Sequence, residues 1–162
     1  MFRKMLLTHH WKKLRIRVWE KRLFHQLEMI SNRFPLAIPC SLHLSWGPFY
    51  GGSVIMDRKC KKAKICIQIP YDRFTTADEQ FVMSHYRIRT NALPYFIFFH
   101  EYFHLMDALT QLRHKKAKDL VAYQAALKNA AQTSTHYRSL HVEQGADDFA
   151  YRQYMDLCEK AG

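Results

Sequence analysis

The chain has 162 residues, of which 48% are hydrophobic and 14% aromatic, so it is long enough for one domain with a real core and too apolar for a disordered protein. Its formal net charge of +11 favours acidic or polyanionic partners without specifying one. No run of about 18 uninterrupted apolar residues occurs, and the apolar patch in MFRKMLLTHHWKK is too short for a signal-peptide core, so we expect neither a membrane span nor a signal peptide. The four cysteines form no Cys-x-x-Cys pair, and we interpret them as reduced thiols of a cytoplasmic protein.

The first predicted element is a basic amphipathic helix over residues 3–30, within an N-terminal segment of residues 1–32. Apolar residues recur along it mostly at three- and four-residue steps, namely Leu7, Trp11, Leu14, Val18, Leu23, Leu27 and Ile30. Its many Lys and Arg residues have two interpretations: a solvated helix face, or a surface that contacts nucleic acid or another anionic partner.

A small sheet is predicted within residues 40–70. Its three short strands cover residues 41–46, 52–57 and 62–69, and the last of them shows the alternation of apolar and polar side chains that is typical of a half-buried strand.

A helical region follows over residues 76–159. It starts with a capping box, Thr76-Ala-Asp-Glu79, which opens a short helix that ends near Ile88.

The next predicted helix is the most apolar segment of the chain. Thr90 or Asn91 can cap it, Pro94 is tolerated in its first turn, and it runs to about Leu112. Because it is apolar nearly all round, we expect it to be the buried central helix. Further helices are predicted at residues 116–130 and 140–159. One helix, a small sheet and then several helices predict a single α+β domain over residues 1–162.

The apolar helix carries His100, Glu101 and His104 in the pattern His-Glu-x-x-His. Burying ionisable groups is costly unless they have partners. Residues four apart share a helix face, so both imidazoles can bind one metal ion, while Glu101 beside them can reach a metal-bound water. The pattern therefore predicts a zinc site with a glutamate base.

A catalytic zinc needs a third protein ligand and an open position for water. The metzincin type is excluded, because Asp107 and Thr110 stand where that type has Gly and His. Asp107 also lies one turn beyond His104, where it would more naturally support a ligand than complete the site. The candidates downstream of the motif are Asp107, His114, His136, His141, Glu143 and Asp147.

Glu143 and Asp147 form a distinct pair among these candidates. They lie four residues apart on the last predicted helix, so both face the same way. One carboxylate could bind zinc, and the other could accept a hydrogen bond from a ligating histidine, as such histidines usually require.

With these two motifs the chain resembles the gluzincin metallopeptidases, and specifically the small ImmA/IrrE-like group. Members of that group pair His-Glu-x-x-His with a downstream Glu-x-x-Ala-Asn/Asp-x-Phe-Ala, which here runs from Glu143 to Ala150. The resemblance covers roughly residues 40 to 155. It implies a zincin-like fold, a small twisted sheet packed on the active-site helix, and Zn²⁺ bound by His100, His104 and Glu143 with support from Asp147.

The resemblance also implies hydrolysis of peptide bonds in a protein or peptide substrate, with Glu101 as the general base. A substrate strand would add to the sheet edge above the zinc, and we take the strand at 62–69 as that edge. The donor to the oxyanion stays open among Tyr137, His136 and His141. No helix-turn-helix is evident, so the repressor-cleaving role of some members is not implied.

Two other interpretations stay open. In an SprT-like protease associated with nucleic acid, His136 or His141 would be the third ligand and the basic N-terminal helix would hold DNA. In a non-catalytic module of the same fold, the site would bind metal or a partner without hydrolysis, and Glu101 would then have no role.

Overall fold

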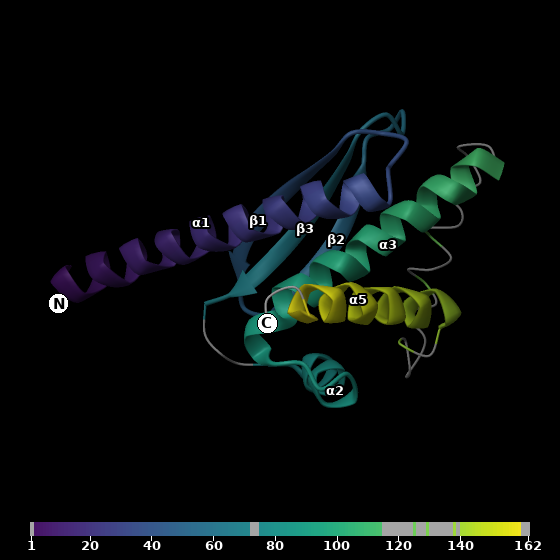
Figure 1. Ribbon diagram of the computed structural model, residues 1–162. Coiled ribbons are helices and arrows are strands. Elements are labelled where there is room, and N and C mark those ends of the chain that lie inside the picture. Colours follow the sequence, from purple (N-terminus) through teal and green to yellow (C-terminus); the bar gives the residue numbers. More distant parts are fainter. Residues whose placement is uncertain are drawn as a thin grey trace.

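The computed structural model describes residues 2–71, 75–114, 125, 129, 138 and 140–159, without the side chains of residues 2–13 and of His114. Within these ranges the protein is α+β, with a three-stranded sheet and helices before and after it (Figure 1). The elements are α1 (Phe2–Arg33), β1 (Cys40–Gly47), β2 (Gly51–Met56), β3 (Ala63–Pro70), α2 (Ala77–His85), the 3₁₀ turn η1 (Thr90–Ala92), α3 (Leu93–His114) and α5 (His141–Glu159). The helix predicted at 116–130 lies outside the described residues except for positions 125 and 129.

The sheet has the strand order β1-β3-β2, with β1 parallel and β2 antiparallel to β3. The predicted strands are confirmed to within one residue, and the inward positions of β3 are buried isoleucines, as the alternation indicated. The expectation that residues 62–69 form a sheet edge is wrong, because β3 pairs on both sides. The edges are β1 and β2, since the third strand of the chain inserts between the first two.

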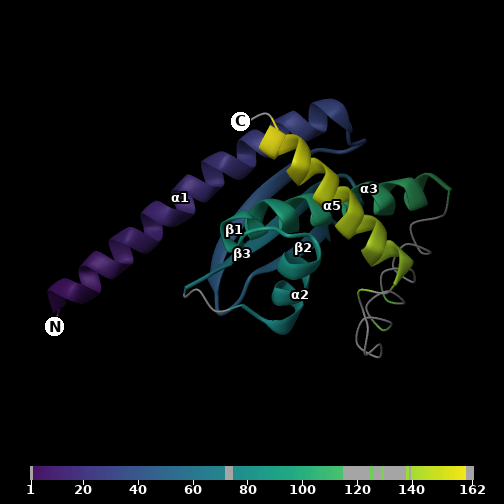
Figure 2. The same cartoon turned by 60° about the horizontal axis from the view of Figure 1, so that its bottom comes forward.

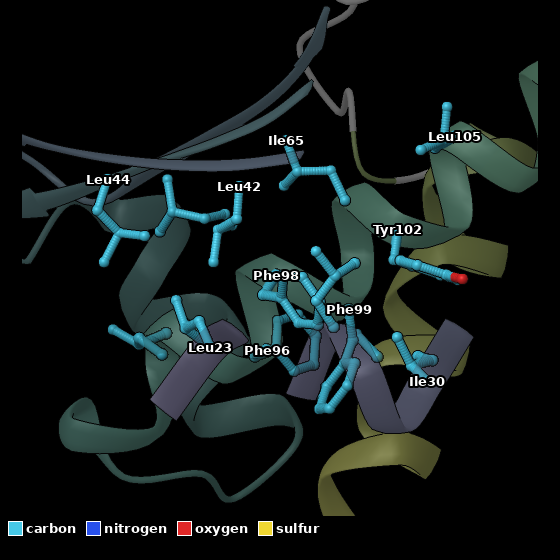
Figure 3. Close-up of a cluster of buried hydrophobic side chains, with 14 of the residues drawn as sticks. Leu23, Ile30, Leu42, Leu44, Ile65, Phe96, Phe98, Phe99, Tyr102 and Leu105 are labelled. Carbon is cyan, nitrogen blue, oxygen red and sulfur yellow. The ribbon is translucent and has the colours of Figure 1, made fainter. Parts of the chain in front are cut away.

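The core lies between the sheet and the helices. Figure 3 shows Leu42, Leu44 and Ile65 pointing from the strands towards the aromatic side chains of α3. Helix α3 buries most of its circumference, as its composition predicted, and its fully buried side chains include Phe96, Phe98, Tyr102 and Leu105. Helix α5 packs along α3, and α1 lies against β1.

The buried side chains among the described residues of α1 lie in its C-terminal half. Trp19, Leu23, Leu27 and Ile30 are in the core, but Leu14 and Val18 are 51% and 42% exposed, so the predicted apolar stripe is wrong at these two positions. The reason is helical geometry: at 100° per residue, Leu14 and Val18 lie about 180° and 140° around the helix from the buried Leu23. Figures 1 and 2 also show the N-terminal end of α1 extending beyond the sheet. Leu7, Trp11 and the basic side chains before residue 14 lie outside the described side chains.

The connection from α2 to α3 differs in detail from the prediction. The capping box is confirmed, because Thr76 Oγ1 accepts from the Glu79 amide and Glu79 Oε2 accepts from the Thr76 amide. Helix α2 ends at His85 rather than near Ile88, since Arg87 adopts a left-handed φ of 52°. Thr90 does not cap α3 but opens η1, and its hydroxyl contacts Met83 Sδ at 3.3 Å.

Two expectations about the whole chain can be compared with the described residues. All four cysteines lie within them, and none of them is joined to another in a disulfide. No described helix is both long enough and apolar enough to cross a membrane.

Candidate metal centre

Helix α3 places His100 and His104 on one face, one turn apart. Their Nε2 atoms are 2.9 Å apart, and the two rings meet edge to face with centroids at 4.6 Å. His100 is buried, while the side chain of His104 is 21% exposed. The pair therefore has one inner member and one that reaches towards solvent.

Helix α5 brings the third donor to this pair. Glu143 is buried, with its Oε2 3.2 Å from His100 Nε2 and its Oε1 3.5 Å from His104 Nε2. The close approach of the two helices depends on small residues in α5: Ala146 and Ala150 are fully buried, and a Cβ added at Gly145 would lie 3.2 Å from Phe103. Among the described residues, His100, His104 and Glu143 are the group that could hold a metal, with one donor atom from each lying within 4.8 Å of the others.

The donor set suits zinc. A tetrahedral zinc with ligand bonds of about 2.0–2.2 Å holds its donor atoms about 3.3–3.6 Å apart. The separations of 2.9, 3.2 and 3.5 Å among the two imidazoles and the carboxylate are close to this range. Two histidines and one glutamate are also a ligand set of catalytic rather than structural zinc sites.

Asp147 supports His100 from the opposite side. Its Oδ1 lies 2.8 Å from His100 Nδ1, so this nitrogen donates its proton to the carboxylate and leaves Nε2 facing Glu143. The predicted arrangement of Glu143 and Asp147 on one face of the last helix is thus observed, with Glu143 beside both imidazoles and Asp147 behind one of them.

Arg138 holds the same carboxylate and was not found from the sequence. Its Nη1 donates to both oxygens of Asp147 at 2.8 Å, and its Nε lies 3.5 Å from Asp78 Oδ2 at the start of α2. No local pattern in the sequence could have indicated this residue. Arg138 contacts both Asp147 of α5 and Asp78 of α2, and only the tertiary fold brings these two helices to the same side chain.

The charges around His100 favour a cation at this place. Burial lowers the pKa of His100, but the hydrogen bonds to Asp147 and Glu143 outweigh it and raise the pKa to about 9. The lone pair of His100 Nε2 and the oxygen of Glu143 repel each other unless a proton or a metal ion lies between them. Burial also raises the pKa of Glu101, although the neighbouring histidines oppose this shift.

Glu101 lies against strand β2 rather than in the donor set. A Cβ built on Gly52 would come within 2.5 Å of Glu101 Oε1 and 2.7 Å of Ile97 Cγ2, so only glycine leaves room for Glu101 at this position. The Gly51-Gly52 pair within a strand is the sequence signal that could have indicated such a close approach.

The other candidate residues lie elsewhere. His141 is exposed at the first position of α5 and is outside the metal-binding group. Asp107 accepts from Gln111 Nε2 at 3.5 Å and is also outside that group. His136 and Tyr137 lie outside the described residues, as does the side chain of His114. The assignment of the oxyanion donor therefore stays a prediction.

A cavity of ≈190 Å³ opens beside His100 and Glu101. Strand β2, helix α2, helix α3 and Arg138 line it.

Comparisons of the chain with protein-family models, with curated proteins and with solved structures found no match. The function has therefore to be inferred from the residues and the geometry of this site.

Proposed function

We propose that the protein is a zinc-dependent peptidase of the gluzincin type, with a zincin-like fold. The observation that carries this proposal is the convergence of His100, His104 and Glu143 from two helices, with Glu101 beside them against the edge strand β2. A metal site without catalysis would have no need of a fourth ionisable group held at this position. Glu143 lies with the two histidines and His141 does not, which supports the gluzincin type over the form of the SprT-like alternative that uses His141.

In this proposal each residue has a separate role. The chemistry that zinc supplies when bound by His100, His104 and Glu143 is the activation of a water molecule near neutral pH. Glu101 takes a proton from the attacking water at its carboxylate and returns it to the leaving amine. Its burial suits both steps, because a raised pKa brings a carboxylate closer to the operating pH. Asp147 and Arg138 keep the ring of His100 in one orientation and tautomer.

Strand β2 is the sheet edge where a substrate would bind. Among the described strands it pairs with β3 alone, and Gly52 lies at the Glu101 carboxylate. An extended peptide that pairs with β2 would therefore pass beside the general base. This assignment replaces β3, which pairs on both sides and has no edge to offer.

Gly52→Ala should lower peptide hydrolysis by about 10²-fold, because the new Cβ displaces the Glu101 carboxylate from its working position. Gly51→Ala is the matched control, since its Cβ would meet only Gln68 Cβ at 3.8 Å, an ordinary contact. The measurement is kcat/KM on one peptide, together with the zinc content of each variant. Neither change should alter the zinc content. Equal activity of the two variants would contradict the placement of Glu101 against β2.

The proposal as a whole is tested by metal removal and replacement. The zinc-loaded protein should cleave an unfolded substrate such as casein, EDTA should abolish the cleavage, and zinc should restore it. His104→Ala should be inactive, whereas His43→Ala, which changes an exposed histidine on β1, should be as active as the unchanged protein. Cleavage that survives EDTA or the His104→Ala change would eliminate this proposal.

Zinc uptake itself offers a second readout of the same experiment. Because the pKa of His100 is about 9 in the metal-free site, this imidazole carries a proton at neutral pH that zinc must displace. Zinc affinity should therefore fall about tenfold for each unit by which the pH is lowered below this pKa. Calorimetry in buffers of different ionisation enthalpy measures the released proton directly.

A further inference from the structure

The cavity beside Glu101 has walls of two kinds. One part is apolar and consists of side chains from α2 and α3, namely Val82, Leu93, Phe96 and Ile97. The other part is charged and includes Asp78 and Glu79 from the first turn of α2, together with Arg138. Its volume of ≈190 Å³ is far above the about 10–15 Å³ that one water molecule requires. The cavity therefore has room for a side chain with an apolar stem and a polar end.

Glu79 is the unusual residue of this wall. It is only 7% exposed, and its Oε2 is used by the capping box, where it accepts from the Thr76 amide at 2.6 Å. Its Oε1 is buried and has no hydrogen-bond partner among the described residues. A buried carboxylate oxygen without a partner is costly, so its presence calls for a binding partner that would offset the cost.

Apart from His100 and Glu101 at the metal centre, the charged side chains of the wall are Asp78, Glu79 and Arg138, and together they have a negative balance. Arg138 is engaged by Asp147 through two bonds of 2.8 Å and lies near Asp78, so its single positive charge faces two carboxylates. Glu79 adds a further negative charge, and it forms no ion pair with a cation among the described residues. The group that best complements this wall is a cation.

We propose that this cavity is a subsite for a cationic side chain, lysine or arginine, of the peptide that the metal centre acts on. The apolar wall accommodates the methylene stem, and Glu79 receives the charged end. Because the cavity opens beside His100 and Glu101, the residue that enters it is next to the bond to be cleaved. The inference rests on the proposed function for the identity of the ligand as a peptide, and it adds the class of side chain.

Peptide binding without turnover tests the subsite. The zinc-loaded Glu101→Gln protein is titrated with fluorescent alanine-based peptides that carry lysine, norleucine or glutamate at one scanned position. Norleucine has nearly the same stem as lysine but no charge. At the best position lysine should bind about tenfold or more tightly than norleucine, because a hydrogen bond to a buried charged group is worth about 1.5–3 kcal/mol, and glutamate should bind most weakly.

The variant that tests Glu79 preserves the capping box with Thr76. Glu79→Gln, made in the same Glu101→Gln background, retains an oxygen for the capping box, which accepts either residue, but it removes the charge. The ratio of lysine to norleucine affinities should fall to within about twofold. Asp148→Asn is the matched control: this exposed carboxylate of α5 lies outside the cavity, so the ratio should stay at its original value.

The results separate the two proposals. If lysine and norleucine peptides bind equally at every position, or if Glu79→Gln leaves the ratio unchanged, the subsite is refuted. If the Glu79→Gln protein does not fold, the relative affinities of the lysine, norleucine and glutamate peptides for the Glu101→Gln protein alone decide whether the subsite exists. Hydrolysis of the same peptides by the unchanged protein tests the peptidase separately. Cleavage without a preference for lysine over norleucine would refute only the subsite. Tighter binding of the lysine peptide without any cleavage would support the subsite and refute the peptidase.

Discussion

Glu101→Gln should lower peptide hydrolysis by about 10²–10⁴-fold while the protein keeps its fold and its zinc. The amide has nearly the shape of the carboxylate, so the contact with Gly52 is preserved. It cannot accept a proton from water at neutral pH, and the general base is therefore lost. Single-turnover hydrolysis of a fluorogenic peptide, with zinc measured on the same sample, gives both quantities.

The control for this change is Glu28→Gln, which alters an exposed glutamate on α1 and should leave hydrolysis as it is. Undiminished turnover by a fully zinc-loaded Glu101→Gln protein would remove Glu101 from the mechanism. Loss of zinc in this variant would have a different meaning, because it would make Glu101 a metal ligand in place of one of the three residues assigned here.

Glu143→Ala should cost the protein its zinc under mild chelation, since two histidines alone hold the metal weakly. Glu143 is the only member of the donor group that comes from α5, and both of its oxygens face the imidazoles. Asp147→Ala should weaken zinc binding by a smaller amount, about 10–100-fold, because it removes the acceptor behind His100 rather than a donor. Competition with a chromogenic chelator measures both affinities.

His141→Ala is the matched control for Glu143→Ala. The two residues are two positions apart at the start of α5, which turns them about 200° from each other around the helix, and His141 is exposed. His141→Ala and His136→Ala should both retain zinc. If either of them lost the metal while Glu143→Ala kept it at full occupancy, a site of three histidines would replace the gluzincin assignment.

The two sides of the site come from different parts of the fold. Helices α3 and α5 supply every donor of the metal centre and the carboxylate behind it, whereas β2 and the first turn of α2 supply the wall where a substrate would lie. Arg138 joins the two sides, because it contacts Asp147 of α5 and Asp78 of α2. Changes in α2 can therefore alter selectivity while the donor set of the metal stays intact.

The sequence by itself determined what depends on local geometry. His100 and His104 share a face because a helix repeats every 3.6 residues, and the same spacing aligns Glu143 with Asp147. The capping box at Thr76 and the alternation in β3 were predictable for the same reason, since each is a relation between residues a few positions apart.

Only the tertiary structure decided the relations between distant segments. Chain order does not give lateral order in a sheet, so the place of β3 between β1 and β2 could not be derived from its alternation. The three- and four-residue steps of α1 likewise did not show which face would be buried, and Leu14 and Val18 are exposed although they follow these steps. The contact of Gly52 with Glu101 and that of Arg138 with Asp78 arise from the packing of elements that are far apart in the chain, and no periodic pattern records such contacts.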